Sequence, residues 1–304
     1  MAPVDTVRRA GTPARRHAAL LGGLVRACRP RQWVKNVLVA AAPGAAGVLF
    51  TVRGGGLTLV AFAVLCLAAG GTYLINDAAD AKADRLHPVK RFRPVAAGIV
   101  PVALAAVLGA VLILTAVGAA LVAGPGLAAA VGGYVALTTA YTFWLKHVPV
   151  LDLIGVAGGF VIRAVAGAVA VGVPISVWFY AVVSLGSLFM VAGKRSAELR
   201  HAGSGRTRAT LTAYSARYLA HVQAMSSGAM IVTYSLWVFQ RHDGIGLALL
   251  TLSIVPFVAI VLRYALLVDS GQGEAPEELV FRDRQLLVTG VVLVALLVAG
   301  TYLN

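Results

Sequence analysis

The stretch Leu57–Asp84, LTLVAFAVLCLAAGGTYLINDAADAKAD, decides the fold class of this chain. It begins with about twenty mainly apolar residues, which is the length one helix needs to cross the hydrocarbon core of a bilayer. It ends in Asn76, Asp77, Asp80 and Asp84, although only 12 of the 304 residues are Asp or Glu. This pattern predicts a membrane-spanning helix with a functional cluster of carboxylates at its end.

Apolar stretches of similar length recur through the chain, in which 59% of the residues are hydrophobic and 12% are charged. They lack the alternating apolar and polar residues of a barrel strand, and lipid cannot satisfy open backbone groups, so each should be a helix. We therefore expect an all-α polytopic membrane protein, a bundle of nine transmembrane helices. The expected spans are residues 36–52, 57–76, 98–121, 126–144, 150–171, 176–193, 219–240, 245–267 and 285–303.

Positive charge is distributed unevenly between the loops that join these spans. Of the 26 Lys and Arg residues, only Arg53 and Arg241 fall in loops on the side opposite the N-terminus. The positive-inside rule then places the N-terminus in the cytoplasm, and nine spans leave Asn304 on the external side. We expect a multi-pass protein of the bacterial cytoplasmic membrane with its active site facing the cytoplasm. The net charge of +14 is explained by topology and anionic lipid, so nucleic acid is not expected as a partner.

The domain organisation follows from the same pattern. Residues 1–20 carry Arg, Pro, Ala and Thr without apolar periodicity, which predicts a disordered basic cytoplasmic tail. Residues 21–304 are expected to form a single transmembrane catalytic domain, with the cytoplasmic loops 77–97 and 193–218 capping the site. The two cysteines, Cys28 and Cys66, are predicted in the cytoplasm and inside a span, so neither a disulfide nor a metal-thiolate site is expected.

The acidic cluster predicts a magnesium site. On a continuous helix Asp77, Asp80 and Asp84 are spaced i, i+3 and i+7, which brings three carboxylates onto one face. A divalent cation would relieve their repulsion. Mg²⁺ suits this face better than zinc because it takes one or two carboxylates together with substrate phosphate oxygens.

A basic segment follows the acidic one. Lys90, Arg91 and Arg93 lie between Pro88 and Pro94, whose fixed backbone angles stiffen the segment. Taken alone, the segment is more simply a loop that fixes topology. Beside carboxylates that bind Mg²⁺, however, three cations favour the binding of a diphosphate.

The chain resembles the UbiA-like intramembrane prenyltransferases over about residues 22–303. The resemblance rests on the pattern Asn-Asp-x-x-Asp-x-x-x-Asp at residues 76–84 and on Lys-Arg-x-Arg-Pro at residues 90–94. Such proteins hold Mg²⁺ around a prenyl diphosphate with this motif and a second acidic motif at the end of helix six. Here the sixth span ends in Gly-Lys-Arg-Ser-Ala-Glu at residues 193–198, so a basic pair replaces one expected acid and only Glu198 remains.

Three further strings resemble one branch of that family, found in mycobacteria and related actinobacteria: RPRQWVKN at residues 29–36, YTFWLKH at 141–147 and AGKR at 192–195. This resemblance implies Mg²⁺-dependent transfer of 5-phosphoribose from 5-phosphoribosyl 1-diphosphate to a polyprenyl phosphate such as decaprenyl phosphate. Diphosphate would be released, and the lipid product would serve cell-wall arabinan synthesis. This donor carries a 5-phosphate in addition to its diphosphate, which a prenyl diphosphate lacks. The additional phosphate would explain why the cations Lys194 and Arg195 stand where an acid is expected.

The candidate site divides into catalytic and substrate-binding residues. We expect Asp77, Asp80, Asp84 and Lys194 to be catalytic, the three aspartates as metal ligands. Substrate binding is assigned to Lys35, Asn36, Asn76, Lys90, Arg91, Arg93, Tyr141, Lys146, Asp152, Arg163, Arg195 and Glu198. Asp152 is either a partner of Lys146 or the acidic start of a helix. Arg163, deep in a span, pairs structurally or contacts substrate, because an unpaired charge there is costly.

Two other functions remain open. A UbiA-like enzyme of another branch would transfer a prenyl group from a prenyl diphosphate to an aromatic or glycerol acceptor. A membrane transporter is the alternative from another class, but its polar groups would gather near the bilayer midplane, where only Arg163 lies. The phosphoribosyl-transfer reading is compatible with a homo-oligomer.

Overall fold

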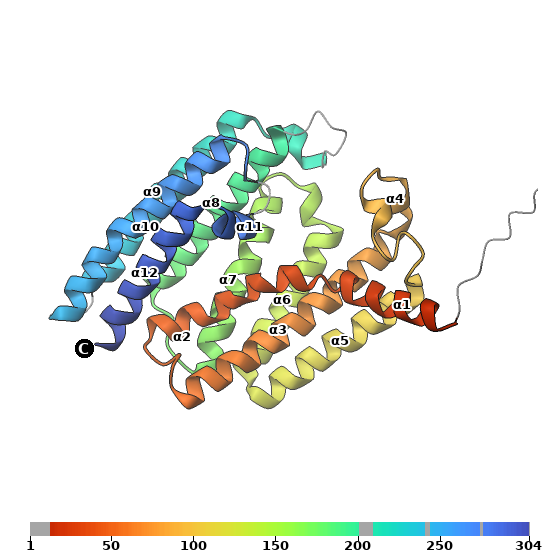
Figure 1. Cartoon of the computed structure of the whole chain (residues 1–304), viewed down its shortest axis with the longest axis horizontal. Coiled ribbons are helices and arrows are strands. Elements are labelled where there is room, and N and C mark those ends of the chain that lie inside the picture. The colour runs from red at the N-terminus through yellow and green to blue at the C-terminus, as the bar shows by residue number, and fades with distance from the viewer. Residues whose placement is uncertain (1–12, 201–208, 241–243, 274–275, 304) are drawn as a thin grey trace, which may run out of the picture. The chain divides into compact units, whose positions relative to one another are not determined.

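The computed structural model describes residues 13–200, 209–240, 244–273 and 276–303, and these residues form helices and connecting turns without any strand (Figure 1). Residues 1–12 of the expected tail, residues 201–208 of the expected capping loop, Arg241 and Asn304 lie outside the described residues. In chain order the elements are α1 (Pro13–Ala27), η1 (Pro30–Ala40), α2 (Ala41–Ala45), α3 (Val52–Ala79), α4 (Ala81–Leu86), η2 (Lys90–Phe92), α5 (Val102–Ala123), α6 (Pro125–Phe143), η3 (Leu145–His147), α7 (Leu151–Val171), α8 (Val177–Arg200), η5 (Ala209–Ala213), α9 (Ala216–Phe239), α10 (Ile245–Asp269), α11 (Pro276–Arg282) and α12 (Arg284–Tyr302).

Eight helices in the described part of the chain are long and apolar enough to cross a membrane: α3, α5, α6, α7, α8, α9, α10 and α12. Their apolar composition and their length of at least 18 residues are what a bilayer requires of a helix. The prediction of an all-α, multi-pass membrane protein is confirmed at this level.

The first expected span was residues 36–52, and the prediction that these residues form one continuous long helix is wrong. The chain forms the 3₁₀ segment η1 up to Ala40 and then the short helix α2, which ends at Ala45. Gly47 has a φ of +74°, a backbone conformation that ends a right-handed helix and suits glycine. Hydropathy alone did not reveal this change of helix type, because it measures transfer to lipid and not backbone geometry.

The expected tail also differs from the structure. Helix α1 begins at Pro13, so residues 13–20 are helical rather than disordered. Proline is well accommodated at a helix start, where its missing N–H would have no partner. The described part of the chain groups into two compact units, unit 1 with residues up to 33 and 67–115, and unit 2 with residues 34–66 and 116 onward. The expectation of a single catalytic domain stays a prediction.

Unit 1 contains a small apolar core and one very close helix contact. Ala27, Leu74 and Val95 are almost completely buried in that core. Where α3 meets α5, a Cβ built on Gly71 would lie 2.7 Å from the carbonyl oxygen of Gly109. Only glycine allows this approach, and small residues are the usual means of packing helices inside a membrane.

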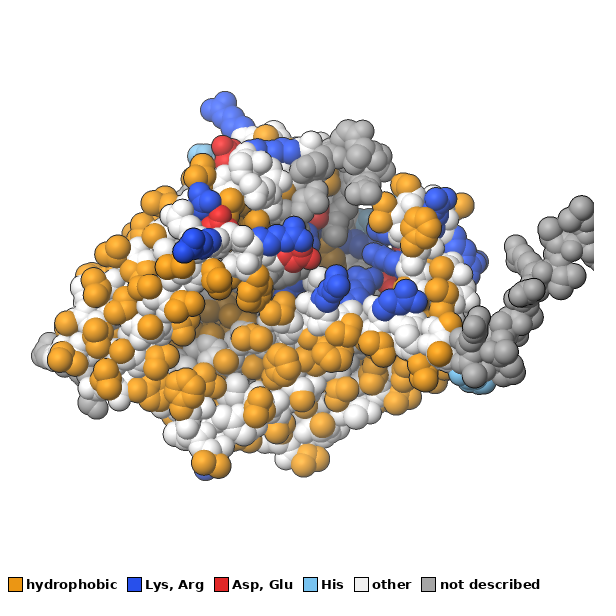
Figure 2. Space-filling model, viewed as in Figure 1, with side chains coloured by type: hydrophobic (Ala, Val, Ile, Leu, Met, Phe, Trp, Pro, Cys, Tyr) orange, Lys and Arg blue, Asp and Glu red, His pale blue; other side chains and the backbone are white. Residues whose placement is uncertain are grey.

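Unit 2 is a set of long helices that pack on neighbours in the chain. Helices α8 and α9 form one contacting pair, α10 contacts both α9 and α12, and α7 packs between α6 and α8. Figure 1 shows α9, α10 and α12 running side by side. In Figure 2 hydrophobic side chains cover the surface of these three helices, as expected for helices that face lipid.

Candidate active site

The acidic segment of unit 1 is not one uninterrupted helix. Helix α3 ends at Ala79, and Asp80 precedes α4 with a ψ of 0° instead of the helical value of about −42°. The N–H of Asp80 still bonds the carbonyl of Asn76, and the N–H of Asp84 that of Asp80, so the chain keeps a nearly helical course. Asp77 and Asp84 are buried, whereas Asn76 and Asp80 are half-buried.

Two arginines hold the buried carboxylates. Arg93 Nη1 lies 2.7 Å from Oδ2 of Asp84 and 3.3 Å from Oδ1 of Asp77, so one guanidinium links both acids. Arg29 Nη2 lies 2.5 Å from the same Oδ1 of Asp77. Buried carboxylates need such partners because desolvation of an unpaired charge costs several kcal/mol. Arg29 was not among the expected site residues, although it begins the RPRQWVKN string.

The other two cations of the basic segment remain at the surface. Lys90 and Arg91 are exposed on η2, and the guanidinium of Arg91 lies 4.8 Å from the ring centre of Phe92. The N–H groups of Val89 and Lys90 both donate to Nδ1 of His87, which fixes the turn before η2. Arg93, the third expected phosphate-binding cation, contacts both Asp77 and Asp84.

The donor set fits a magnesium ion shared with a phosphate. Within the described ranges no group of three or more His, Cys, Asp or Glu side chains is arranged to hold a metal ion, so the expected three-carboxylate cluster is not formed. Asp77 and Asp84 nevertheless both form an ion pair with Arg93. Oδ2 of Asp77 and Oδ1 of Asp84 take no part in the ion pairs with Arg29 and Arg93. Mg²⁺ is commonly bound through one or two carboxylates, water and substrate phosphates. The contribution of Asp80 stays a prediction.

Unit 2 contains a second charged cluster, centred on Arg195. This side chain is 2% exposed, and all three of its nitrogens are used. Nε donates to Asp152 at 2.9 Å, Nη1 to Glu198 at 2.9 Å and Nη2 to the hydroxyl of Tyr141 at 3.2 Å. Four expected site residues from α6, α7 and α8 are thus brought together around one guanidinium.

Asp152 is completely buried in the first turn of α7, where it also accepts a hydrogen bond from the hydroxyl of Tyr214. That hydroxyl in turn accepts the N–H of Val150, whose positive φ of 70° is unusual for a β-branched residue. Burial and the bond to Asp152 raise the pKa of Tyr214 to about 12, so its hydroxyl is protonated near neutral pH. The sequence gave no signal for this contact.

Arg163 has polar partners deep inside unit 2. Its Nε donates to Oδ1 of Asn36 at 2.7 Å, Nη1 to the carbonyl of Gly159 at 2.7 Å and Nη2 to the hydroxyl of Tyr134 at 3.1 Å. Asn36 itself donates to Sγ of Cys66 at 3.2 Å. Of the two expected roles for Arg163, the geometry favours structural pairing.

A cavity of about 430 Å³ opens in unit 2, and two of the expected site residues, Lys35 and Lys194, line it. Nearly all other lining side chains are apolar. Besides the two lysines, the lining residues are Val34, Leu38, Val156, Phe160, Val182, Val183, Gly186, Ser187, Met190, Val191, Val280 and Phe281. The two members of the basic pair therefore differ: Arg195 is buried in an ionic cluster, whereas Lys194 lies on the wall of an apolar cavity.

Comparison with known proteins places this arrangement in a family. A profile described as the UbiA prenyltransferase family matches residues 37–284. The chain belongs to the UbiA prenyltransferase family. Family membership makes it a transferase, and the transporter alternative is no longer supported.

Among relatives of this UbiA family member, a Corynebacterium glutamicum protein named decaprenyl-phosphate phosphoribosyltransferase is 44% identical over 292 residues, covering 93% of this chain and 88% of the relative. A Mycobacterium tuberculosis protein of the same name is 43% identical over 290 residues, covering 91% and 94%. A solved UbiA homologue from Archaeoglobus fulgidus, bound to GPP and Mg²⁺, superposes with a TM-score of 0.68 at 17% identity and covers 92% of this chain and 98% of its own. That structure supports the fold alone.

Proposed function

We propose that this transferase moves 5-phosphoribose from 5-phosphoribosyl 1-diphosphate to decaprenyl phosphate or a similar polyprenyl phosphate. The observation that carries the proposal is the 44% identity to a decaprenyl-phosphate phosphoribosyltransferase over 93% of the chain. The matched region includes all the charged clusters described above. The alternative of prenyl transfer to an aromatic or glycerol acceptor would need a second acidic motif, and the sixth span ends instead in Lys194 and Arg195.

The diphosphate of the donor is assigned to unit 1. Asp77 and Asp84 would hold Mg²⁺, which when bound supplies positive charge to the departing diphosphate. Arg29 and Arg93 already contact these acids and present charge-assisted donors suited to phosphate oxygens. Asn76, Lys90 and Arg91 belong to the same segment and are proposed to contact the donor as well.

The reaction needs positioning and electrostatic stabilisation rather than a covalent intermediate. An oxygen of the lipid phosphate attacks C1 of the ribose while the bond from C1 to the diphosphate oxygen breaks, and diphosphate leaves. The attacking phosphate is already ionised near neutral pH, so no strong general base is required. Tyr141 and Lys146 are proposed to contact the phosphate groups of the substrates. Glu198 is proposed to act on substrate binding through Arg195, which it bonds together with Tyr141.

The charge distribution supports a cytoplasmic site. The donor is a highly charged, water-soluble molecule, and the carboxylates lie in the segment with Lys82, Arg85 and the cations of residues 90–93, which the positive-inside rule assigns to the cytoplasm. We propose a bacterial cytoplasmic-membrane location on this basis, with product use in cell-wall arabinan synthesis.

A transfer assay tests the proposed function. Purified protein with Mg²⁺, a polyprenyl phosphate and donor labelled in the ribose should yield labelled lipid and free diphosphate. EDTA should abolish the product, and added Mg²⁺ should restore it. Absence of labelled lipid, with turnover of a prenyl diphosphate and an aromatic acid instead, would place the chain in another branch of the family.

A further inference from the structure

The cavity in unit 2 combines an apolar wall with two cations and no acid. Apart from Lys35, Lys194 and Ser187, all its lining residues are apolar or glycine. Ser187 already donates to the carbonyl of Val183. A site with this lining is complementary to a ligand that has one anionic end and an apolar remainder.

Lys194 presents a positive charge at the wall of the cavity. It is half-buried, and within the described residues it makes no hydrogen bond or ion pair. An ammonium group at an apolar wall loses hydrogen bonds to water. A bound phosphate would accept hydrogen bonds from the ammonium group in place of that water. Arg195, its neighbour, is fully engaged by Asp152, Glu198 and Tyr141.

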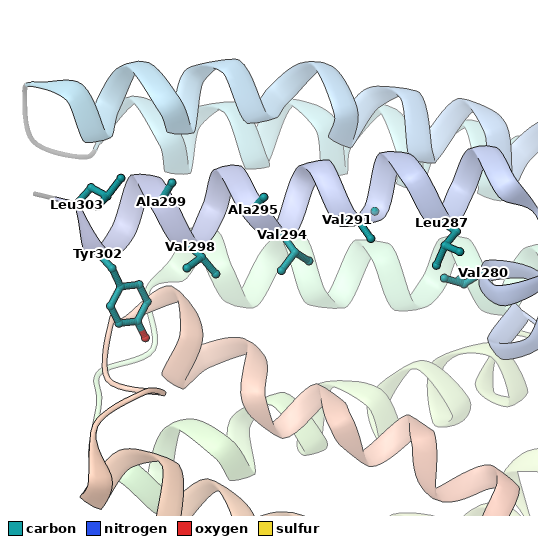
Figure 3. A pocket seen from close by; sticks show the side chains of 10 residues that line it. Val280, Leu287, Val291, Val294, Ala295, Val298, Ala299, Tyr302 and Leu303 are labelled. Carbon is teal, nitrogen blue, oxygen red and sulfur yellow. The ribbon is translucent and has the colours of Figure 1, made fainter.

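A second apolar groove continues from the cavity. It follows α12 past Leu287, Val291, Val294 and Val298 to Tyr302, and Val280 of α11 lines both the cavity and this groove (Figure 3). Its volume is about 780 Å³. The 19 residues of α12 extend for about 28 Å, close to the thickness of the hydrocarbon core.

We propose that Lys35 and Lys194 bind the phosphate of the polyprenyl phosphate acceptor, and that the polyprenyl chain leaves the cavity along the α12 groove. This inference rests on the proposed function and assigns its acceptor site. The soluble donor carries no apolar part, so an apolar wall continuing along a membrane-spanning helix offers it nothing. A lipid phosphate matches both features, because its charged head meets the lysines and its chain meets the groove. Lys194 and Arg195 were both expected to bind the donor. Lys194 is now assigned to the acceptor instead.

Separate titration of the two substrates tests the head-group site. Lys194→Met and Lys35→Met should each raise the acceptor KM about 10- to 150-fold, the effect of losing a charge-assisted contact, and change the donor KM less than about 2-fold. Arg282→Ala is the control, since this arginine follows the lining residues Val280 and Phe281 on α11, while its own side chain is 77% exposed and outside the lining. A raised donor KM with an unchanged acceptor KM would overturn the assignment.

Lysine protection in the wild-type protein covers the case in which these variants fail to fold. Acylation of Lys194 by an amine-reactive reagent, quantified by mass spectrometry, should be slowed by polyprenyl phosphate. Polyprenol and inorganic phosphate should not slow it at the same concentrations. Equal protection by inorganic phosphate or by the donor would refute the inference. If wild-type protein makes no labelled lipid at all, the proposed function fails instead, and these protection results still report on the lysine site.

The groove is tested by filling it. A Cβ on Gly290 would meet no atom within 4 Å, so Gly290→Phe should fold and place its ring in the groove. We expect the acceptor KM to rise at least about 10-fold for a long polyprenyl phosphate and to stay unchanged for a short-chain analogue, since about 25 cal/mol is lost per Å² of apolar contact. Gly228→Phe on α9, which is equally unhindered and outside the groove, is the control. An equal effect on both chain lengths would show that the groove does not hold the chain.

Discussion

At the scale of single residues, the acidic motif is organised by two arginines, and the local pattern identifies only Arg93. Arg29 reaches Asp77 across 48 residues of sequence, and Tyr214 reaches Asp152 across 62. Periodicity reports neighbours on one helix and carries no information about partners this far apart. The sequence therefore predicted which residues are charged and clustered, namely Asp77, Asp84 and Arg93, but not Arg29 or Tyr214.

Asp77→Asn should lower kcat by roughly 100- to 1,000-fold, the usual cost of removing one preorganised electrostatic group from a reaction centre. The amide cannot supply the charge that Mg²⁺ and the two arginines share. Steady-state kinetics at several Mg²⁺ concentrations would measure the loss, with Asp84→Asn and Asp80→Asn alongside. Unchanged kcat for Asp77→Asn at ordinary Mg²⁺ would remove the metal role.

Tyr214→Phe should destabilise the protein by about 1–3 kcal/mol, because Asp152 loses a donor and the N–H of Val150 loses its acceptor. The pKa of Tyr214 is raised from 10 to about 12, so the wild-type contribution is fully present below pH 10 and is lost as the pH rises toward 12. The measurement is the Tm difference between wild type and Tyr214→Phe in detergent at a series of pH values. A difference that did not shrink between pH 10 and 12 would contradict the assignment of the proton to this hydroxyl.

At the scale of elements, the start of α12 shows how a single residue combines two functions. The Oδ1 of Asp283 accepts the N–H of Leu286 as the helix cap, and both carboxylate oxygens bond Arg263 of α10. The bond from Arg263, followed by the backbone bond from Leu286, lowers the pKa of Asp283. Its contribution to stability is therefore present above the ordinary Asp pKa of about 4 and is lost as the pH falls below it.

Asp283→Asn keeps a good cap and removes the ion pair, whereas Asp283→Ala removes both. We expect the alanine variant to be the less stable of the two, because it also loses the helix cap. Thermal unfolding in detergent at pH 7 would measure the difference. Equal Tm values would show that the side chain stabilises α12 through Arg263 alone.

At the scale of the whole molecule, composition predicted an all-α membrane protein correctly. That class depends only on the length and apolarity of each helix. The first span was missed because the chain forms the 3₁₀ segment η1 before α2. A 3₁₀ helix rises about 2.0 Å per residue, so the 11 residues of η1 and the 5 of α2 extend for about 30 Å if they run along one axis. That length is enough to cross a bilayer without a long α-helix.

We therefore predict that this segment crosses the membrane and, with the eight long helices, leaves Asn304 outside. The charges support the crossing, because otherwise the basic N-terminal segment and the basic segment after α3 would lie on opposite sides. A cysteine at Asn304 should react with an impermeant maleimide in intact cells, as should one at Arg53, whereas Lys82→Cys should react only after lysis. The native thiols give little background, since Cys66 is buried and burial raises the pKa of Cys28. Labelling at Asn304 that required lysis would mean that η1 and α2 stay on one side of the bilayer.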